Sequence, residues 1–394
     1  MKSIHPFPAR MAPDILEELL ETVPTAGVVL DPMCGSGTVV RKAAYSGKKA
    51  RGSDTDPLAL LMTSVATKKV DPRTIDDRLD WLTAYVQKHQ SRLQSILGCA
   101  ETEQFASFWF GPEQHRQLNA IARGILKLEQ NSTPKRIIDL FRLALSRTII
   151  TKSKGATLAA DVSHSRPHRV RCSNDYDVLE NFTGFVTSIV REVNLHHIKY
   201  PAKVSIDDAR LLKTVGSSSV DVIITSPPYL NALDYLRGHR LSLIWLGKTI
   251  PDLRTLRGNN VGSERSLPRD ALPVVPEAEI LRDFSALSSL SPRHLAMTVR
   301  FASDLALMCK QFARVLKSKS QLHVVIGNST LGDVYIPNSE IFAHSARKFG
   351  FKLKTEKERE IPESKRYLPI GKGTRNLQKR MRTEVIQSYE LAKD

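Results

Sequence analysis

The tetrapeptide Ser226-Pro227-Pro228-Tyr229 follows an apolar run at 220–225 that predicts a buried strand. The two prolines remove backbone donors and stiffen the chain, so the segment presents hydrogen-bond acceptors in a fixed arrangement. The Ser226 hydroxyl and the Pro227 carbonyl could accept hydrogen bonds from one exocyclic amino group, and Tyr229 could stack on the heterocycle that bears it. The nitrogen lone pair would then point at an electrophilic methyl group, and the remaining catalysis would be proximity and alignment.

A second stretch with chemical potential is DPMCGSGT at 31–38, which lies between a short apolar run and a predicted helix. Strand, glycine-rich turn and helix form the first half of a nucleotide-binding α/β unit, in which glycines let the backbone approach a ligand. The next strand ends in Asp54 and Asp56, and either acid could bind ribose hydroxyls. Because Asp31 closes the first strand and only one Gly-x-Gly is present, the pattern favours a cationic ligand, S-adenosylmethionine, over a dinucleotide.

These two loops must be positioned by a sheet, and the apolar runs predict seven strands in one doubly wound α/β core. Apolar residues at helical spacing over 67–200 predict a helical insertion between the second and third strands. The core is therefore expected in two parts, 1–66 and 201–394, with a long loop at 230–300. In open α/β sheets ligands bind beyond the carboxyl ends of the strands, which is where both loops would emerge.

The charge balance predicts a polyanionic partner. Lys and Arg number 58 against 41 Asp and Glu, a net charge of +17, and nucleic acid is the usual partner of such a surplus. Four cysteines without a CxxC pair favour neither a zinc site nor a disulfide framework, and no apolar run is long enough for a membrane span. We therefore expect a cytoplasmic protein without a metal. The predicted DNA-binding residues are Arg166, Arg169 and Arg171 as phosphate contacts, with Asn231 and Arg237 after the catalytic loop.

Taken together, HPFPARM at 5–11, DPMCGSGT, the acidic end of RGSDTD, DDA at 207–209 and TSPPY resemble the amino-methylating DNA methyltransferases. The resemblance implies a seven-stranded class I methyltransferase sheet, S-adenosylmethionine as cofactor, and transfer of a methyl group to an exocyclic amine of a base flipped out of double-stranded DNA. It implies Ser226, Pro227, Pro228 and Tyr229 as the catalytic residues. The cofactor-binding residues that it implies are His5, Pro6, Phe7, Asp31, Pro32, Cys34, Gly35, Gly37, Thr38, Asp54 with Asp56 as second choice, and Asp208 with Asp207 behind it.

Serine at the first position of the catalytic motif is commoner in relatives that methylate N4 of cytosine, so cytosine is favoured over N6 of adenine. The alternatives are an RNA or protein methyltransferase and a nucleic-acid-binding protein without turnover. Cys34 could suggest a nucleophile, but methylation at a ring carbon needs a Pro-Cys context that the chain lacks. Either the insertion or the loop at 230–300 could read the DNA sequence, and the resemblance allows a cognate restriction endonuclease as a further partner.

Overall fold

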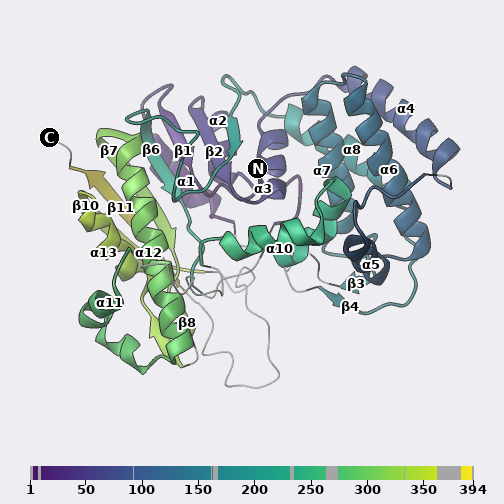
Figure 1. Ribbon diagram of the computed structural model, residues 1–394. Coiled ribbons are helices and arrows are strands. Elements are labelled where there is room, and N and C mark those ends of the chain that lie inside the picture. The colour runs from purple at the N-terminus through teal and green to yellow at the C-terminus, as the bar shows by residue number, and fades with distance from the viewer. Residues whose placement is uncertain are drawn as a thin grey trace.

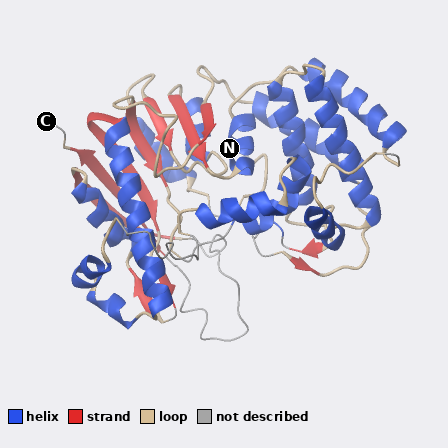
Figure 2. Ribbon diagram, in the orientation of Figure 1, coloured by secondary structure: helices blue, strands red, loops and turns tan. Residues whose placement is uncertain are grey.

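The central element of the molecule is a seven-stranded sheet (Figures 1 and 2). The computed structural model describes residues 3–7, 10–91, 93–160, 162, 167–230, 235–262, 274–331, 333–361 and 383–392. The strands of the sheet are β1 (Val28–Asp31), β2 (Lys49–Asp54), β5 (Lys203–Ile206), β6 (Val220–Thr225), β7 (Leu316–Ile326), β10 (Phe351–Glu360) and β11 (Thr383–Leu391). Two short hairpins, β3 (Ala159–Ala160) with β4 (His168–Arg169) and β8 (Ser329–Leu331) with β9 (Val334–Ile336), lie outside it.

The order of the strands is β10-β11-β7-β6-β1-β2-β5, and β5, β2, β1, β6 and β7 run parallel. The last two strands form an antiparallel hairpin, with β11 inserted between β10 and β7. The sequence predicted this seven-stranded α/β sheet, and the prediction is confirmed. The strand order reverses between β1 and β6, which is the point in such sheets where a crevice for ligands opens.

Helices cover both faces of the sheet, as alternating side chains require. Val29 packs in one apolar cluster with α1 (Pro13–Glu21) and α2 (Thr38–Tyr45), whereas the next residue, Leu30, packs in another with α12 (Pro292–Val315) and α13 (Asn338–Lys348). Both residues are almost fully buried, and burying such a side chain contributes roughly 1.5–3 kcal/mol. The doubly wound arrangement therefore follows from strands that are apolar on both sides.

The helices between β2 and β5, within the range 67–200 predicted as a helical insertion, lie beside the sheet (Figure 2). Its core continues into α3 (Pro57–Ala66) through Leu58 and Met62 and into η2 (Ile244–Leu246) through Trp245. The insertion thus packs against a helix that precedes it in the sequence and a helix that follows it. Its helices are α4 (Pro72–His89), α5 (Ala100–Trp109), α6 (Pro112–Gln130), α7 (Lys135–Ile149) and α8 (Val178–Asn194).

The prediction of a long loop at 230–300 is wrong for the described part of that range. It contains α9 (Tyr235–Leu243), α10 (Ile250–Asn259), α11 (Glu277–Asp283), η3 (Ser285–Ser289) and the first turns of α12. The physical reason is local: Thr249 and Asp252 form a reciprocal capping box at the start of α10. Within the described residues, no helix combines the length and apolarity needed to cross a bilayer.

Candidate active site

The predicted cofactor loop and the predicted catalytic loop leave neighbouring strand ends. β1 and β6 pair in parallel through Val29 with Val222 and Leu30 with Ile223. Asp31 then accepts a hydrogen bond at Oδ1 from the Thr225 hydroxyl (2.9 Å), one residue before Ser226. The two motifs, almost two hundred residues apart in sequence, therefore meet at the switch point of the sheet.

Asp31 is a buried carboxyl group, 4% exposed. Burial raises its pKa to about 7, and the charge of Asp54 adds to this, while hydrogen bonds from Thr225 and the Met33 amide oppose it. A carboxylate in such a place is stabilised when a cation neutralises it. The electrostatics of this strand end thus suit a positively charged ligand.

The glycine-rich turn adopts backbone conformations that need glycine. Gly35 and Gly37 have φ of 48° and 78°, in the left-handed region that favours glycine. A Cβ atom on Gly37 would lie 2.5 Å from the Thr63 hydroxyl, and one on Gly35 would lie 3.1 Å from the Phe7 ring. Gly37 is the N-cap residue of α2, which begins at Thr38, so the turn directs the N-terminal amides of this helix toward the crevice.

The two acids that end β2 have different partners. Asp54 accepts hydrogen bonds from the Gly35 amide at Oδ2 (2.8 Å) and from the Asp56 amide at Oδ1 (2.9 Å), and burial raises its pKa to about 6. Asp56 instead caps α3 through the Leu58 amide (2.8 Å), and its other oxygen contacts Nδ1 of His239 (2.5 Å). Asp54 therefore lies against the cofactor loop, whereas both oxygens of Asp56 are used inside the fold.

The N-terminal segment lies against the glycine-rich loop through Phe7 rather than through His5. The Phe7 ring packs against Gly35 and stacks on Tyr235, with centroids 5.0 Å apart. His5 is buried, its Nδ1 donates to the Pro6 carbonyl (2.7 Å), and its Nε2 accepts from the Ser146 hydroxyl of α7 (2.9 Å). Burial lowers the pKa of His5 to about 3, so this histidine is neutral and both of its nitrogens are engaged.

The acids after β5 are also held by neighbours. Asp207 is buried and accepts hydrogen bonds from the amides of Lys213 and Thr214, which shapes its own turn. Asp208 forms a two-oxygen ion pair with Arg210, whose guanidinium also donates to Asp304 (2.8 Å). Of the two, Asp208 is the less buried, and this arginine joins it to Asp304 of α12.

The catalytic tetrapeptide follows β6 directly. Pro227 is buried, and Ser226 and Tyr229 are half-buried. Burial raises the pKa of Tyr229 to about 12, while hydrogen bonds with Ser226 and Gly327 oppose this. The tyrosine hydroxyl thus stays protonated at neutral pH and lies beside the serine that the sequence singled out.

Cys34 is fully enclosed in the cofactor loop, with Sγ 3.6 Å from the Thr63 hydroxyl. Burial raises its pKa well above the ordinary value of a thiol, so Cys34 is a packed neutral side chain rather than a nucleophile. Pro32 contributes its carbonyl, which accepts a hydrogen bond from the Ser53 hydroxyl (3.4 Å).

The predicted DNA-binding residues occupy two places. Arg169 lies on β4 and Arg171 follows it, both on the insertion, whereas Arg237 lies on α9 after the catalytic loop. Arg166 and Asn231 fall outside the described residues. The sequence did not single out His239 or Arg210. In the structure His239 contacts Asp56 and Arg210 contacts Asp208. Arg210 directly follows the DDA motif and could have been found from it, but no motif marks His239.

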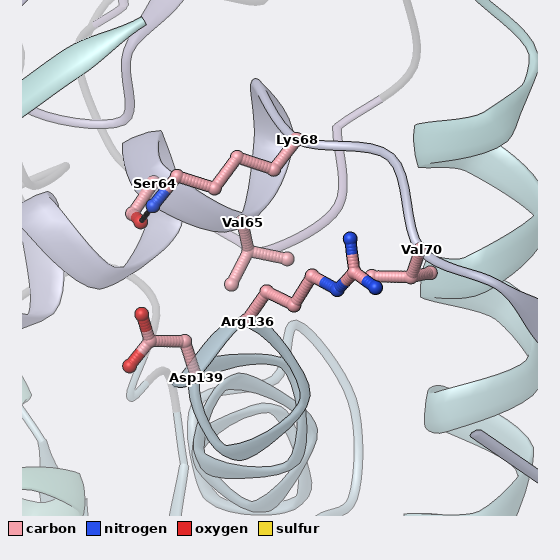
Figure 3. Close-up of a pocket in the computed structure, with 6 residues that line it drawn as sticks. All are labelled: Ser64, Val65, Lys68, Val70, Arg136 and Asp139. Atoms are coloured by element: carbon pink, nitrogen blue, oxygen red, sulfur yellow. Dashed lines mark hydrogen bonds between the residues drawn. The ribbon is translucent and has the colours of Figure 1, made fainter. Parts of the chain in front are cut away.

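Two other groups of polar side chains lie close together, but most of their charged members already have partners. Figure 3 shows a pocket between α3 and α7 in which Lys68 donates to the Ser64 hydroxyl (2.8 Å). Asp139, which also lines it, pairs with Lys135. Lys68 and Asp139, two of its charged groups, therefore already have partners. Among the described residues, one set of metal-capable side chains gathers at Glu279, Asp283 and His344, but Glu279 is paired with His344 and Lys348.

Comparison with known proteins finds methyltransferases among the proteins that this chain resembles. No protein-family model matches it. The Type II methyltransferase M.MvaI of Kocuria varians is 22% identical over 374 residues, spanning 88% of this chain and 80% of that protein. The Type II methyltransferase M.AvaI of Nostoc sp. is 24% identical over 393 residues, spanning 89% and 76%. A solved SAM-dependent methyltransferase of Methanosarcina mazei aligns with 98% of this chain and 100% of its own chain. Its sequence identity of 8% and TM-score of 0.35 are too low to support a functional conclusion. The similarity to the two Type II methyltransferases supports a methyltransferase.

Proposed function

We propose that the protein is a SAM-dependent DNA methyltransferase that modifies an exocyclic amino group, with N4 of cytosine as the favoured target. The observation that carries the proposal is the hydrogen bond between Thr225 and the buried Asp31, which joins the start of the cofactor loop to the end of β6, directly before Ser226. A cation-binding carboxylate and a set of amine-binding acceptors lie at adjacent strand ends, and methyl transfer from a sulfonium to an amine needs both. The similarity to Type II methyltransferases over most of the chain agrees with it.

On this proposal, Asp31 holds the positively charged methionyl part of the cofactor and Asp54 holds its ribose. Asp31 suits the cation because its burial leaves the carboxylate without a counter-charge. Asp54 is fixed by the Gly35 and Asp56 amides, and its oxygens retain lone pairs for hydroxyl donors. When bound, S-adenosylmethionine supplies an electrophilic methyl group.

The catalytic loop acts on the amine. The Ser226 hydroxyl and the Pro227 carbonyl each accept a hydrogen bond from the amino group. These bonds draw the nitrogen lone pair out of conjugation with the ring and aim it at the methyl carbon. Tyr229 packs on the base as an uncharged ring, since its hydroxyl stays protonated. The nitrogen would form a bond to the methyl carbon as the bond between that carbon and the cofactor's sulfur breaks, and S-adenosylhomocysteine would leave. The methylated nitrogen would then lose one proton to solvent water. The serine of this motif is the feature that favours cytosine over adenine.

The base must leave the duplex to reach the loop, so the protein must hold double-stranded DNA while it is flipped out. The net charge of +17 supports a polyanionic substrate. Arg166, Arg169 and Arg171 are the proposed phosphate contacts, and Asn231 and Arg237 are proposed to act near the flipped base. A cognate restriction endonuclease is the proposed partner in the cell.

The test is to incubate the protein with unmethylated DNA and labelled S-adenosylmethionine, digest the product and identify the nucleoside by mass. We expect N4-methylcytosine. N6-methyladenine would keep the mechanism but overturn the base assignment, and label found only in RNA or protein would overturn the substrate.

Ser226→Ala tests the catalytic assignment in the same assay. Loss of one acceptor from the reacting amine should lower the rate about 10²- to 10³-fold, while binding of S-adenosylmethionine stays unchanged. Ser288→Ala, which alters an exposed serine of η3, is the matched control and should leave the rate unchanged. An unaltered rate for Ser226→Ala would remove the serine from the mechanism.

A further inference from the structure

The aromatic segment on α5 has one ring that the fold leaves in solvent. Phe108 is 50% exposed, whereas the next two residues, Trp109 and Phe110, are 8% and 2% exposed. Trp109 contacts Phe108 edge-on, with centroids 5.0 Å apart, so the helix already has buried rings for its core. Phe108 is therefore available for a contact outside the chain.

A positive charge lies directly on this ring. The guanidinium of Arg169 is 4.9 Å from the Phe108 centroid, a cation–π distance. The strand β4 that carries Arg169 is tied to α5 by backbone hydrogen bonds, from the Leu158 amide to the Trp109 carbonyl (2.8 Å) and from the Val170 amide to the Leu158 carbonyl (3.0 Å). The ring and the cation thus form a fixed pair at the surface, beside Val170, which is 58% exposed.

The helix that carries Phe108 also contacts the segment that follows the catalytic loop. Phe105 lies 5.0 Å from the guanidinium of Arg240 on α9, and the Phe110 ring meets Trp245 edge-on at 5.4 Å. The helix α10 connects α5 with the residues after β2. At its start, the Ile250 amide donates a hydrogen bond to the Thr102 hydroxyl of α5 (3.0 Å). At its end, the Asn260 side chain accepts a hydrogen bond from the Thr55 hydroxyl, which follows β2. Figure 1 shows α5, β3, β4 and α10 along the same lower side of the molecule.

We propose that Phe108 and Arg169 form a DNA-contact edge on the helical insertion, in which Phe108 packs against the bases and Arg169 binds the backbone phosphates. An exposed ring suits the flat apolar faces of bases, and the guanidinium suits the polyanion beside them. Because α5 packs on the helix that follows the catalytic loop, a duplex that delivers a base to Ser226 lies against this edge. The inference rests on the proposed function and assigns DNA reading to the insertion.

The experiment measures the affinity of the full-length protein for an unmethylated duplex by fluorescence anisotropy, at several salt concentrations. Phe108→Ala should weaken binding roughly tenfold or more, and Phe108→Trp should restore most of the loss because it keeps a stacking ring. Arg169→Ala should weaken binding and lower the slope of log affinity against log salt by about one. Each variant is checked by thermal unfolding and by calorimetric binding of S-adenosylmethionine, which should not change.

Leu195→Ala and Arg116→Ala are the matched controls, since they remove an exposed apolar side chain at the end of α8 and an exposed arginine of α6. Unchanged duplex affinity in both Phe108→Ala and Arg169→Ala, with a wild type that binds and methylates DNA, overturns the inference and leaves the proposed function intact. A wild type that binds S-adenosylmethionine but neither binds nor methylates a duplex overturns both. Should Phe108→Ala fail to fold, Phe108→Leu keeps an apolar side chain and still removes the ring.

Discussion

Asp31 gives the sharpest test of the cofactor site, because its charge is unfavourable without a cation. Burial raises its pKa to about 7, whereas an aspartate in an unfolded chain titrates near about 3.9. The folded protein therefore binds more protons than the unfolded chain between these values, so Asp31 lowers the stability of the ligand-free protein as pH rises from about 4 to about 7. At about 1.4 kcal/mol per pH unit, the ionised carboxylate costs roughly 2–4 kcal/mol above pH 7.

Asp31→Asn removes this cost and also removes the counter-charge for the cofactor. In ligand-free form at pH 8 we expect the variant to unfold at a higher temperature than the wild type, with a gain that grows from pH 4 to pH 7 and is then constant. A cationic ligand needs the ionised form of Asp31, so wild-type affinity for S-adenosylmethionine should fall about tenfold between pH 8 and pH 6. The variant should bind weakly at both values.

Thermal unfolding followed by circular dichroism, and calorimetric titration with S-adenosylmethionine, measure the two effects separately. Asp54→Asn is the contrasting variant: both of its oxygens accept backbone hydrogen bonds, so it should destabilise the ligand-free protein. The reasoning is refuted if Asp31→Asn is the less stable protein at pH 8, or if it binds S-adenosylmethionine as tightly as the wild type does.

Two further predictions concern the supports of the site, and urea unfolding measures both. Gly37→Ala should cost roughly 2–4 kcal/mol, because φ is 78° and the new Cβ would overlap Thr63; Gly47→Ala, also at positive φ but with open space around it, should cost only about 1 kcal/mol. An equal loss in both would contradict the packing argument. Asp56→Ala should cost roughly 2–4 kcal/mol, because it removes the cap of α3 and leaves the buried His239 without its carboxylate. Asp71→Ala, which removes an exposed cap of α4, should cost clearly less; equal losses would show that the histidine contact contributes nothing.

The framework of the fold could be predicted because its signals are local. The strands β1 and β6 are short, mostly apolar runs, and they end at polar or proline-containing loops that stand in the sequence itself. The start of α10 could also have been predicted from the sequence, because Thr249 and Asp252 form a capping pair there. The region was nevertheless predicted as a loop. Turn-forming residues on either side and scattered charges made the region resemble a loop, although the capping pair indicates a helix.

The site was predicted only as far as its motifs extend. Asp31, Gly37 and Ser226 stand in patterns whose chemistry can be argued from spacing. The roles of Asp56 and His5 could not be separated from those of their neighbours, because they depend on partners far away in the sequence: His239 is 183 positions from Asp56, and Ser146 is 141 from His5. No periodicity or spacing encodes such contacts.

These distant contacts explain why a large insertion between β2 and β5 does not disturb the cofactor loop. Thr63 of α3 donates to the Gly35 carbonyl (3.1 Å), while the other side of α3 shares a core with the insertion. Asp56, at the start of the same helix, holds His239 on α9, which follows the catalytic loop. One short helix thus contacts the cofactor loop, the insertion and the helix after the catalytic loop. A change in how the insertion packs therefore has a direct structural route through α3 to the predicted cofactor loop and to α9.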